Sequence, residues 1–342
     1  MKRRLSILVL AVLMLAGCQG EEAAGPKRFE ASYLELFDTV TRIVGYADSE
    51  EAFRAEAQKI HDEMLEYHQL YDIYNEYEGM PNLKTINDNA GVAPVKVDGK
   101  IIDLLLFCRE LYDQTGGQVN VGMGSVLSLW HEARQAGIDD PESAVLPDEE
   151  ALRRAAGHIA MENVVIDREA STVYIADPEQ RLDVGAVAKG YAVERVCENA
   201  PEGLLISAGG NVKATGPKPT DGSAWTVGVQ HPDGEEKGFL HTLYVDDMSV
   251  VTSGDYQRYY TVDGEIYHHI IDPATLYPAG YWRSVTVLHT DSGLADGLST
   301  ALFTLPREEG QALLDHYGAE AMWVDKEGNM QYSDGFSDYI RT

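Results

Sequence analysis

The chain has 342 residues, enough for one large domain or for two small ones that share a core. It carries 56 acidic and 27 basic residues, a formal net charge of −29, and so acidic a surface repels nucleic acid and anionic lipid headgroups. A nucleic-acid partner is therefore excluded, and an anionic ligand has to be held by a metal ion or by a local group of cations.

The first residues have the layout of a secretory signal. A basic start at residues 2–4 is followed by an apolar run over residues 5–15 and then by Ala16-Gly17-Cys18. The run is shorter than the roughly 20 residues that a membrane span requires. This ending resembles a lipobox, which predicts a signal peptide over 1–17, a lipid on Cys18 and a flexible tether over 18–28. We therefore expect a mature protein on the extracytoplasmic face of the cell membrane, held there by its lipid alone. An ordinary cleaved signal with an incidental cysteine is the alternative.

The alternation and spacing of apolar residues predict the elements that follow. In the N-terminal half they are a strand over 29–46, a helix over 50–70, an irregular stretch over 71–94, a helix over 101–115, a loop that becomes a helix over 122–137, a short helix over 147–157 and a hairpin of 164–166 with 173–175. In the C-terminal half they are a helix over 185–199, a buried strand over 204–207, strands from 225 to 267, a strand over 284–288, helices over 294–305 and 308–316, and strands at 323–324 and at the C-terminus. Because strands and helices do not alternate regularly, the sequence predicts an α+β fold of mixed sheets with flanking helices, in one domain over 29–342.

Besides Cys18, the chain has two cysteines, Cys108 and Cys197, both in predicted helices. Their spacing suggests neither a disulfide framework nor a metal site, so we favour two small buried apolar side chains. In an exported protein two thiols can also oxidise, and a disulfide between them stays open.

Two segments combine glycines with groups that suit an anion. In residues 183–191, Asp183 and Gly185 precede a predicted helix that contains Lys189, so backbone N–H groups and an ammonium lie where an anion could bind. In residues 207–211, two glycines follow an apolar strand and permit a ligand to approach the backbone closely. A capped helix and a plain turn are the alternatives.

Two further segments carry polar side chains suited to binding or proton transfer. Residues 251–259 combine hydroxyls, Arg258 and tyrosines, which suit phosphate or ring stacking, although a strand with an exposed polar face explains them too. In residues 267–273, His268 and His269 are adjacent on a predicted strand, so their rings point to opposite faces and only one can face a given site. A structural histidine is the competing interpretation.

The fifth segment, residues 294–303, is a predicted helix, which puts Asp296 and Thr300 one turn apart on the same face. A carboxylate and a hydroxyl are hard oxygen ligands of the kind that Mg²⁺ accepts, with phosphates and water completing the octahedron. A capping aspartate and a solvated threonine are the alternative.

Taken in order, the five segments resemble the ApbE family of FAD:protein FMN transferases. The family pattern includes D-x-G-x-x-A-K-G, A-G-G-N/D, T-S-G-x-Y-x-R, H-I-I-D-P and A-D-A-L-S-T, and this chain is similar to all five between Asp183 and Thr300. The resemblance extends to residues 37–39, to Tyr74 and to the glycine pair before Trp130, and so covers nearly the whole mature chain. It implies an ApbE-like, T-fold-like architecture.

The chain departs from the family pattern in a few places. The positions are Asn120 and Gln257, which are often acidic in the family, Leu276, which is usually glycine, and Gly297, which is usually alanine. These departures concern loop geometry and contacts to the flavin edge, and they leave the metal and histidine positions intact.

The resemblance implies a ligand set for Mg²⁺ and for FAD. The metal would be held by the Ala186 carbonyl, Asp296 and Thr300, together with FAD phosphate oxygens. The implied FAD contacts, with Tyr74 as the stacking partner of the ring, are Phe37, Tyr74, Gln118, Val119, Asn120, Asp183, Lys189 and Ile271. His269 is the implied proton acceptor, because an alcohol needs one to act as a nucleophile near neutral pH.

The implied reaction is attack by a Thr or Ser hydroxyl of an acceptor protein on the FMN phosphorus of FAD, with release of AMP. The acceptor would be another exported or membrane protein with a short flavinylation motif. A Mg²⁺-dependent FAD pyrophosphatase and a flavin-binding lipoprotein are the alternatives that use the same site. A solute-binding lipoprotein is disfavoured because it requires regular βαβ alternation.

Overall fold

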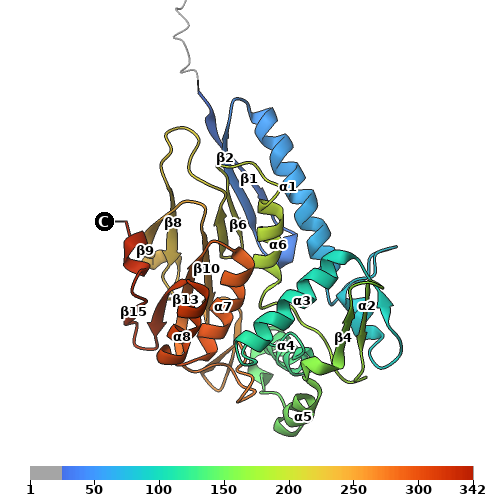
Figure 1. Ribbon diagram of the computed structural model, residues 1–342. Coiled ribbons are helices and arrows are strands. Elements are labelled where there is room, and N and C mark those ends of the chain that lie inside the picture. The colour runs from blue at the N-terminus through green and yellow to red at the C-terminus, as the bar shows by residue number, and fades with distance from the viewer. Residues whose placement is uncertain (1–24, 342) are drawn as a thin grey trace, which may run out of the picture.

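The computed structural model describes residues 25–341, in which a long sheet is flanked by helices and a smaller, mainly helical part lies beside it (Figure 1). The predicted signal peptide, Cys18 and most of the predicted tether lie outside the described residues. The first strand begins at Lys27, so the folded part starts slightly before the predicted boundary at residue 29.

An eight-stranded sheet forms the centre of the larger part. Its strand order is β1-β2-β6-β7-β10-β13-β14-β15, and all of its ladders are antiparallel. The strands are β1 (Lys27–Tyr33), β2 (Thr41–Ala47), β6 (Leu205–Ala208), β7 (Asn211–Ala214), β10 (Ser249–Gly254), β13 (Trp282–His289), β14 (Glu320–Asp325) and β15 (Met330–Tyr332). Antiparallel pairing throughout this sheet confirms the predicted α+β class.

Helices cover one face of this sheet (Figure 1). They are α1 (Glu50–Tyr71), α6 (Ala188–Cys197), α7 (Ser292–Thr304) and α8 (Arg307–Tyr317). Because side chains alternate along a strand, Val251 belongs to the apolar cluster of α7 and α8, whereas its neighbour Val250 belongs to a cluster on the opposite face. That second face is covered by a hairpin of β8 (Trp225–Gln230) with β9 (Phe239–Val245) and by the 3₁₀ helix η6 (Phe336–Tyr339).

The smaller part carries the remaining helices. They are α2 (Leu83–Asp88), α3 (Gly99–Gln114), α4 (Gly124–Asp139) and α5 (Glu149–Ala155). A three-stranded sheet of order β3-β5-β4 lies with them, formed by β3 (Val95–Lys96), β4 (Val164–Asp167) and β5 (Thr172–Ile175). A hairpin of β11 (Tyr259–Val262) and β12 (Glu265–His268) packs on α4 through the ring of Tyr260. The short 3₁₀ helices are η1 (Leu36–Asp38), η2 (Pro141–Ser143), η3 (Ala156–His158), η4 (Met161–Asn163) and η5 (Glu235–Lys237).

The long helices and most of the later strands lie where the sequence predicts them, and two of the errors fall in the N-terminal third. The single strand predicted over 29–46 is wrong: it is a hairpin of β1 and β2 that turns through η1. The stretch predicted to be irregular contains α2, whose N-terminus is closed by a reciprocal capping box between Asn82 and Thr85. The pattern also missed β7, which follows β6 directly.

Cys108 and Cys197 are free and buried, which confirms the favoured interpretation of two small apolar side chains. Burial raises the pKa of both thiols, so neither is poised to react. No helix within residues 25–341 is long and apolar enough to cross a membrane.

Candidate functional site

The start of α6 lies directly against α7, and a glycine makes this contact possible. A Cβ atom at Gly190 would lie 2.3 Å from the Ser292 carbonyl oxygen and 2.5 Å from Cβ of Asp296, so a larger residue does not fit. The Gly190 N–H donates a hydrogen bond of 2.8 Å to Oδ2 of Asp296, and Nζ of Lys189 lies 4.0 Å from the same oxygen. Two of the predicted segments thus meet at one carboxylate.

Asp296 is buried with little compensation for its charge. Burial raises its pKa, and the Lys189 charge and the Gly190 N–H only partly oppose this. The amide of Asn211 lies beside the carboxylate, yet its Nδ2 is buried without a hydrogen-bond partner in residues 25–341. A buried carboxylate in such surroundings fits a bound cation.

The other two predicted metal ligands belong to the same pair of elements. Thr300 lies one turn after Asp296 within α7, as the helical spacing predicts, and Ala186 lies in the turn that precedes α6; both are partly exposed. Across residues 25–341, no group of three or more His, Cys, Asp or Glu side chains could hold a metal ion. The predicted set therefore has one carboxylate and two neutral oxygens, which suits a hard divalent cation that takes further ligands from phosphate and water.

The loop that carries Phe37 is held in an unusual backbone conformation. Phe37 and Asp38 have φ angles of 53° and 54°, in the left-handed region that residues other than glycine rarely adopt. The Phe37 N–H donates to Nδ1 of His68 at 3.2 Å, and the two rings meet edge to face with centroids 5.5 Å apart. Thr39 packs onto Gly209, where an added Cβ would lie 2.4 Å from Oγ1 of Thr39. Tertiary contacts thus fix this loop against the predicted glycine pair, and such strain is concentrated at functional sites.

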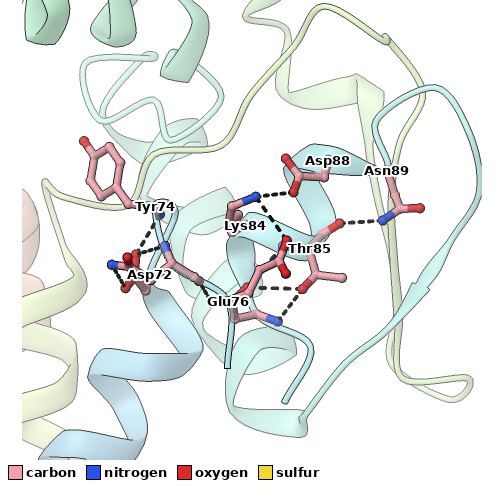
Figure 2. Close-up of polar contacts among 9 residues, drawn as sticks. Asp72, Tyr74, Glu76, Lys84, Thr85, Asp88 and Asn89 are labelled. Atoms are coloured by element: carbon pink, nitrogen blue, oxygen red, sulfur yellow. Dashed lines mark hydrogen bonds and ion pairs between the residues drawn. The ribbon is translucent and has the colours of Figure 1, made fainter. Parts of the chain in front are cut away.

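Tyr74 is presented by a loop that one carboxylate organises (Figure 2). Asp72 accepts hydrogen bonds from the N–H groups of Tyr74 (2.6 Å) and Asn75 (3.0 Å), from Nδ2 of Asn75 (2.9 Å) and from the Tyr77 hydroxyl (2.8 Å). Burial by itself would raise the pKa of Asp72, but these hydrogen bonds hold it below its usual range. The ring of Tyr74 projects away from this cluster, and the residue is 56% exposed. An exposed ring on a fixed loop is suited to stacking on a flat ligand.

Basic side chains from α4 gather beside Tyr74, and the sequence analysis did not identify them. The ring of His131 lies 5.4 Å from that of Tyr74, between centroids. Arg134 donates from Nη2 to Nδ1 of His131 at 2.9 Å, which places the proton of a neutral His131 on Nε2. Burial, and then the charge of Arg134, lower the pKa of His131.

Asp183 lies among these groups. Burial raises the pKa of its carboxyl, and the hydrogen bond from the Gly185 N–H (2.8 Å) opposes the rise. The charges of His131, Arg258 and Arg134 also act on it, so these residues from distant segments face one another. Burial of the Tyr74 hydroxyl contributes most to the raised pKa of Tyr74, and the charge of Asp183 raises it further.

Of the two adjacent histidines, His268 is structural and His269 faces the basic group. His268 is buried at the end of β12, where Nε2 donates to the Ala279 carbonyl at 3.0 Å and Nδ1 accepts from the Ile270 N–H at 3.3 Å. His269 lies just after the strand, and its Nδ1 donates to the Arg258 carbonyl at 3.2 Å. Burial, and then the Arg258 charge, lower the pKa of His269 to about 3, so the ring is neutral near pH 7 and Nε2 keeps its lone pair.

The side chains of the predicted turn before α4 are mostly used by the fold itself. Oε1 of Gln118 accepts a 2.8 Å hydrogen bond from the Thr304 hydroxyl of α7, and Val119 is buried in the largest apolar cluster. Asn120 donates to the Ile159 carbonyl and accepts from the Gly122 N–H. Ile271 is likewise buried in an apolar cluster. Any contact of Val119 or Ile271 with a ligand therefore has to use the backbone.

Two features of the predicted motifs have structural roles. In residues 251–259 the hydroxyls of Thr252 and Ser253 are bonded to Thr286 (2.9 Å) and Ser299 (2.7 Å), which leaves Arg258 as the group that faces the site. Leu276, which stands where the family usually has glycine, has a φ of 63°, and its carbonyl accepts the indole N–H of Trp130 at 2.9 Å. The departure in sequence therefore keeps the left-handed backbone that glycine would permit without strain.

Comparisons with known proteins agree with the motifs. A family model described as ApbE family matches residues 37–323. An FAD:protein FMN transferase of Treponema pallidum is 34% identical over 277 residues, which cover 76% of this chain and 75% of that protein. One from Klebsiella pneumoniae is 32% identical over 279 residues, 78% of this chain and 84% of that protein.

Solved structures have the same fold. An ApbE protein from Thermotoga maritima superposes with a TM-score of 0.81 at 30% identity, covering 92% of this chain and 100% of that one. The flavin transferase ApbE from Vibrio cholerae gives a TM-score of 0.74 at 23% identity, covering 92% and 99%, and this likeness concerns the fold alone. The α+β architecture expected from the sequence is confirmed.

Proposed function

Because this chain belongs to the ApbE family, and because Tyr74, Asp183 and His269 converge from distant segments, we propose that it transfers FMN from FAD to another protein. We further propose that the acceptor atom is a Thr or Ser hydroxyl and that AMP is released. The convergence is the observation that carries this proposal, since a protein that only stored flavin would need the aromatic ring but no group able to accept a proton.

Mg²⁺ is the metal that we propose for the site, held by Asp296, Thr300 and the Ala186 carbonyl. When bound, it would supply charge stabilisation at the pyrophosphate oxygens. The buried and poorly compensated carboxylate of Asp296 supports a cation there. Lys189 adds a positive charge at the same end of the site.

His269 is the proposed proton acceptor for the attacking hydroxyl. Its ring is oriented by the Arg258 carbonyl, so Nε2 remains available as a base. A pKa of about 3 makes the free ring a weak base, and an anionic ligand beside it would raise that value by offsetting the Arg258 charge. The proposed nucleotide would therefore strengthen the base as it binds.

We propose that residues 1–17 are removed as a lipoprotein signal and that a lipid on Cys18 holds the protein at the extracytoplasmic membrane face. The sequence layout of this leader supports the proposal. Acceptors would then be exported or membrane proteins with a short flavinylation motif within reach of the tether. A gel-mobility assay would test this proposal. Both globomycin treatment and a Cys18→Ser variant should leave the leader attached, and the variant should also lack the lipid.

The transfer reaction is tested by mass spectrometry of a motif-bearing domain incubated with the leaderless protein, FAD and Mg²⁺. We expect the acceptor to gain one FMN with the wild type and to gain none with Asp296→Asn or His269→Asn. Asp315→Asn, on the exposed side of α8, is the matched control and should be fully active. Free FMN and AMP with an unmodified acceptor would replace the proposal by an FAD pyrophosphatase, and intact FAD would leave a flavin-binding lipoprotein.

A further inference from the structure

We propose that Arg134 and Arg258 form an anion-binding subsite that holds the FMN-side phosphate of the flavin nucleotide. The inference rests on the proposed function. It assigns a ligand to Arg258, whose segment suits phosphate by its sequence, and to Arg134, which no motif singled out. They come from α4 and from the turn just before β11.

The two guanidinium groups lie in the same part of the molecule. Arg134 is hydrogen-bonded to Nδ1 of His131 at 2.9 Å, and the Arg258 carbonyl accepts from Nδ1 of His269 at 3.2 Å. The charges of both guanidinium groups act on Tyr74, Asp183, His131 and His269. Burial, and then the charge of Arg258, lower the pKa of Arg134, which places the two arginines near each other as well. The backbone of Arg258 is tied to His269, whose N–H donates to its carbonyl at 3.1 Å.

Neither guanidinium is neutralised by a carboxylate. Among residues 25–341, the side chain of Arg258 forms no hydrogen bond or ion pair, and Arg134 bonds only to the neutral ring of His131. The charge of Asp183 acts on both guanidinium groups. Its carboxylate nevertheless makes no ion pair within 4.0 Å with either arginine in residues 25–341. In a chain with 56 acidic and 27 basic residues, a pair of like charges without a carboxylate is a place for a ligand anion.

Phosphate fits this pair better than the flavin ring does. The ring of oxidised flavin is uncharged and cannot balance two cations, whereas a phosphate carries negative charge and matches the planar fork of a guanidinium. Arg134 is bonded to His131, whose ring lies 5.4 Å from the exposed ring of Tyr74, so a flavin stacked on Tyr74 would have its ribityl phosphate within reach of these groups. The phosphate would then lie beside His269.

The test compares FMN with riboflavin, which differ only in the phosphate. Both are titrated by flavin fluorescence into the leaderless protein with EDTA present, so that no metal contributes to binding. We expect wild type to bind FMN at least about tenfold more tightly than riboflavin, and Arg258→Gln to remove most of that preference while leaving riboflavin binding within about twofold. Arg54→Gln, which removes an exposed arginine from α1, is the charge-matched control and should behave as wild type.

Arg134→Gln should have the same effect on FMN, and Arg134→Lys should restore part of it. Arg258→Gln is the decisive variant, because its exposed side chain has no partner in the described chain and the fold does not depend on it. Equal weakening of FMN and riboflavin, or no FMN preference in wild type, would overturn the subsite while leaving flavin transfer intact. Failure of wild type to bind either flavin both in EDTA and in a repeat titration with Mg²⁺ would contradict the proposed function itself.

Discussion

Replacing Gly190 by alanine tests whether the contact between α6 and α7 creates the proposed metal site. The new Cβ would lie 2.3 Å from the Ser292 carbonyl oxygen, whereas such carbon–oxygen contacts normally stay beyond about 3.3 Å, so the helices have to separate by about 1 Å. Overpacking of this kind costs about 1–3 kcal/mol of unfolding free energy. Helix propensity alone predicts the opposite sign, a gain of about 1 kcal/mol for Gly→Ala within a helix.

The displacement also has a consequence for metal binding. Ligand distances tolerate deviations of about 0.2 Å, so a shift of about 1 Å between Gly190 and Asp296 should weaken Mg²⁺ binding at least tenfold. Urea unfolding gives the stability and isothermal titration with Mg²⁺ gives the affinity. Gly99→Ala in α3 is the control, because nothing lies within 4 Å of the new Cβ, and it should change neither quantity for the worse. A Gly190→Ala protein that is more stable than wild type and binds Mg²⁺ equally well would refute the reasoning.

Three further outcomes follow from the site. Asp296→Asn should raise the melting temperature of the metal-free protein, because burial raises the pKa of Asp296 and its charge destabilises the fold above about pH 4. At a Mg²⁺ concentration one hundred times the wild-type Kd, the wild type should gain about 2.7 kcal/mol of unfolding free energy, and the variant should gain none. Asp72→Ala should weaken riboflavin binding about tenfold, because it releases the Tyr74 loop. Tyr77→Phe removes only one of the hydrogen bonds to Asp72, so it should cost about 1 kcal/mol of unfolding free energy and change riboflavin binding little. Equal riboflavin binding by Asp72→Ala and wild type would contradict this. The NMR resonances of the His269 ring should titrate near pH 3 rather than near 6.5. The contribution of His269 to the free energy of unfolding is therefore fully present above pH 6.5 and is lost as the pH falls toward 3. A titration near pH 6.5 would show that the ring is not held neutral.

The helical spacing of the two proposed metal ligands in α7 was predictable because its information is local. Helical spacing alone places Asp296 and Thr300 one turn apart, and α7 has that geometry. The strand rule shows only that His268 and His269 cannot both face one site, and the choice of His269 came from the family resemblance. The structure adds the reason for the choice, because β12 ends at His268, and His269 is held by the Arg258 carbonyl instead.

The parts that sequence could not predict depend on contacts between distant segments. The left-handed backbone at Phe37 is imposed by the hydrogen bond to His68 and by the close approach of Gly209 to Thr39. No local sequence pattern predicts it, because the chain has no glycine at that position. His131 and Arg134 have the spacing of ordinary solvent-facing residues on α4, so their sequence resembles that of any polar helix face. The available signal was the pair His131 and Arg134 directly after Trp130, a basic group in a strongly acidic chain.

The site contains unfavourable features of opposite sign, and one ligand would relieve them together. The carboxylate of Asp296 is buried, with the Lys189 ammonium 4.0 Å away and one hydrogen bond from the Gly190 N–H. Arg134 and Arg258, by contrast, repel each other and have no carboxylate within 4.0 Å in residues 25–341. A divalent cation would offset the first and a phosphate anion the second, and a metal–pyrophosphate carries both charges at once. Metal or phosphate alone would correct one imbalance and leave the other. This division of charge would let a protein of net charge −29 hold a dinucleotide, and we expect binding of the metal and binding of the phosphate to favour each other.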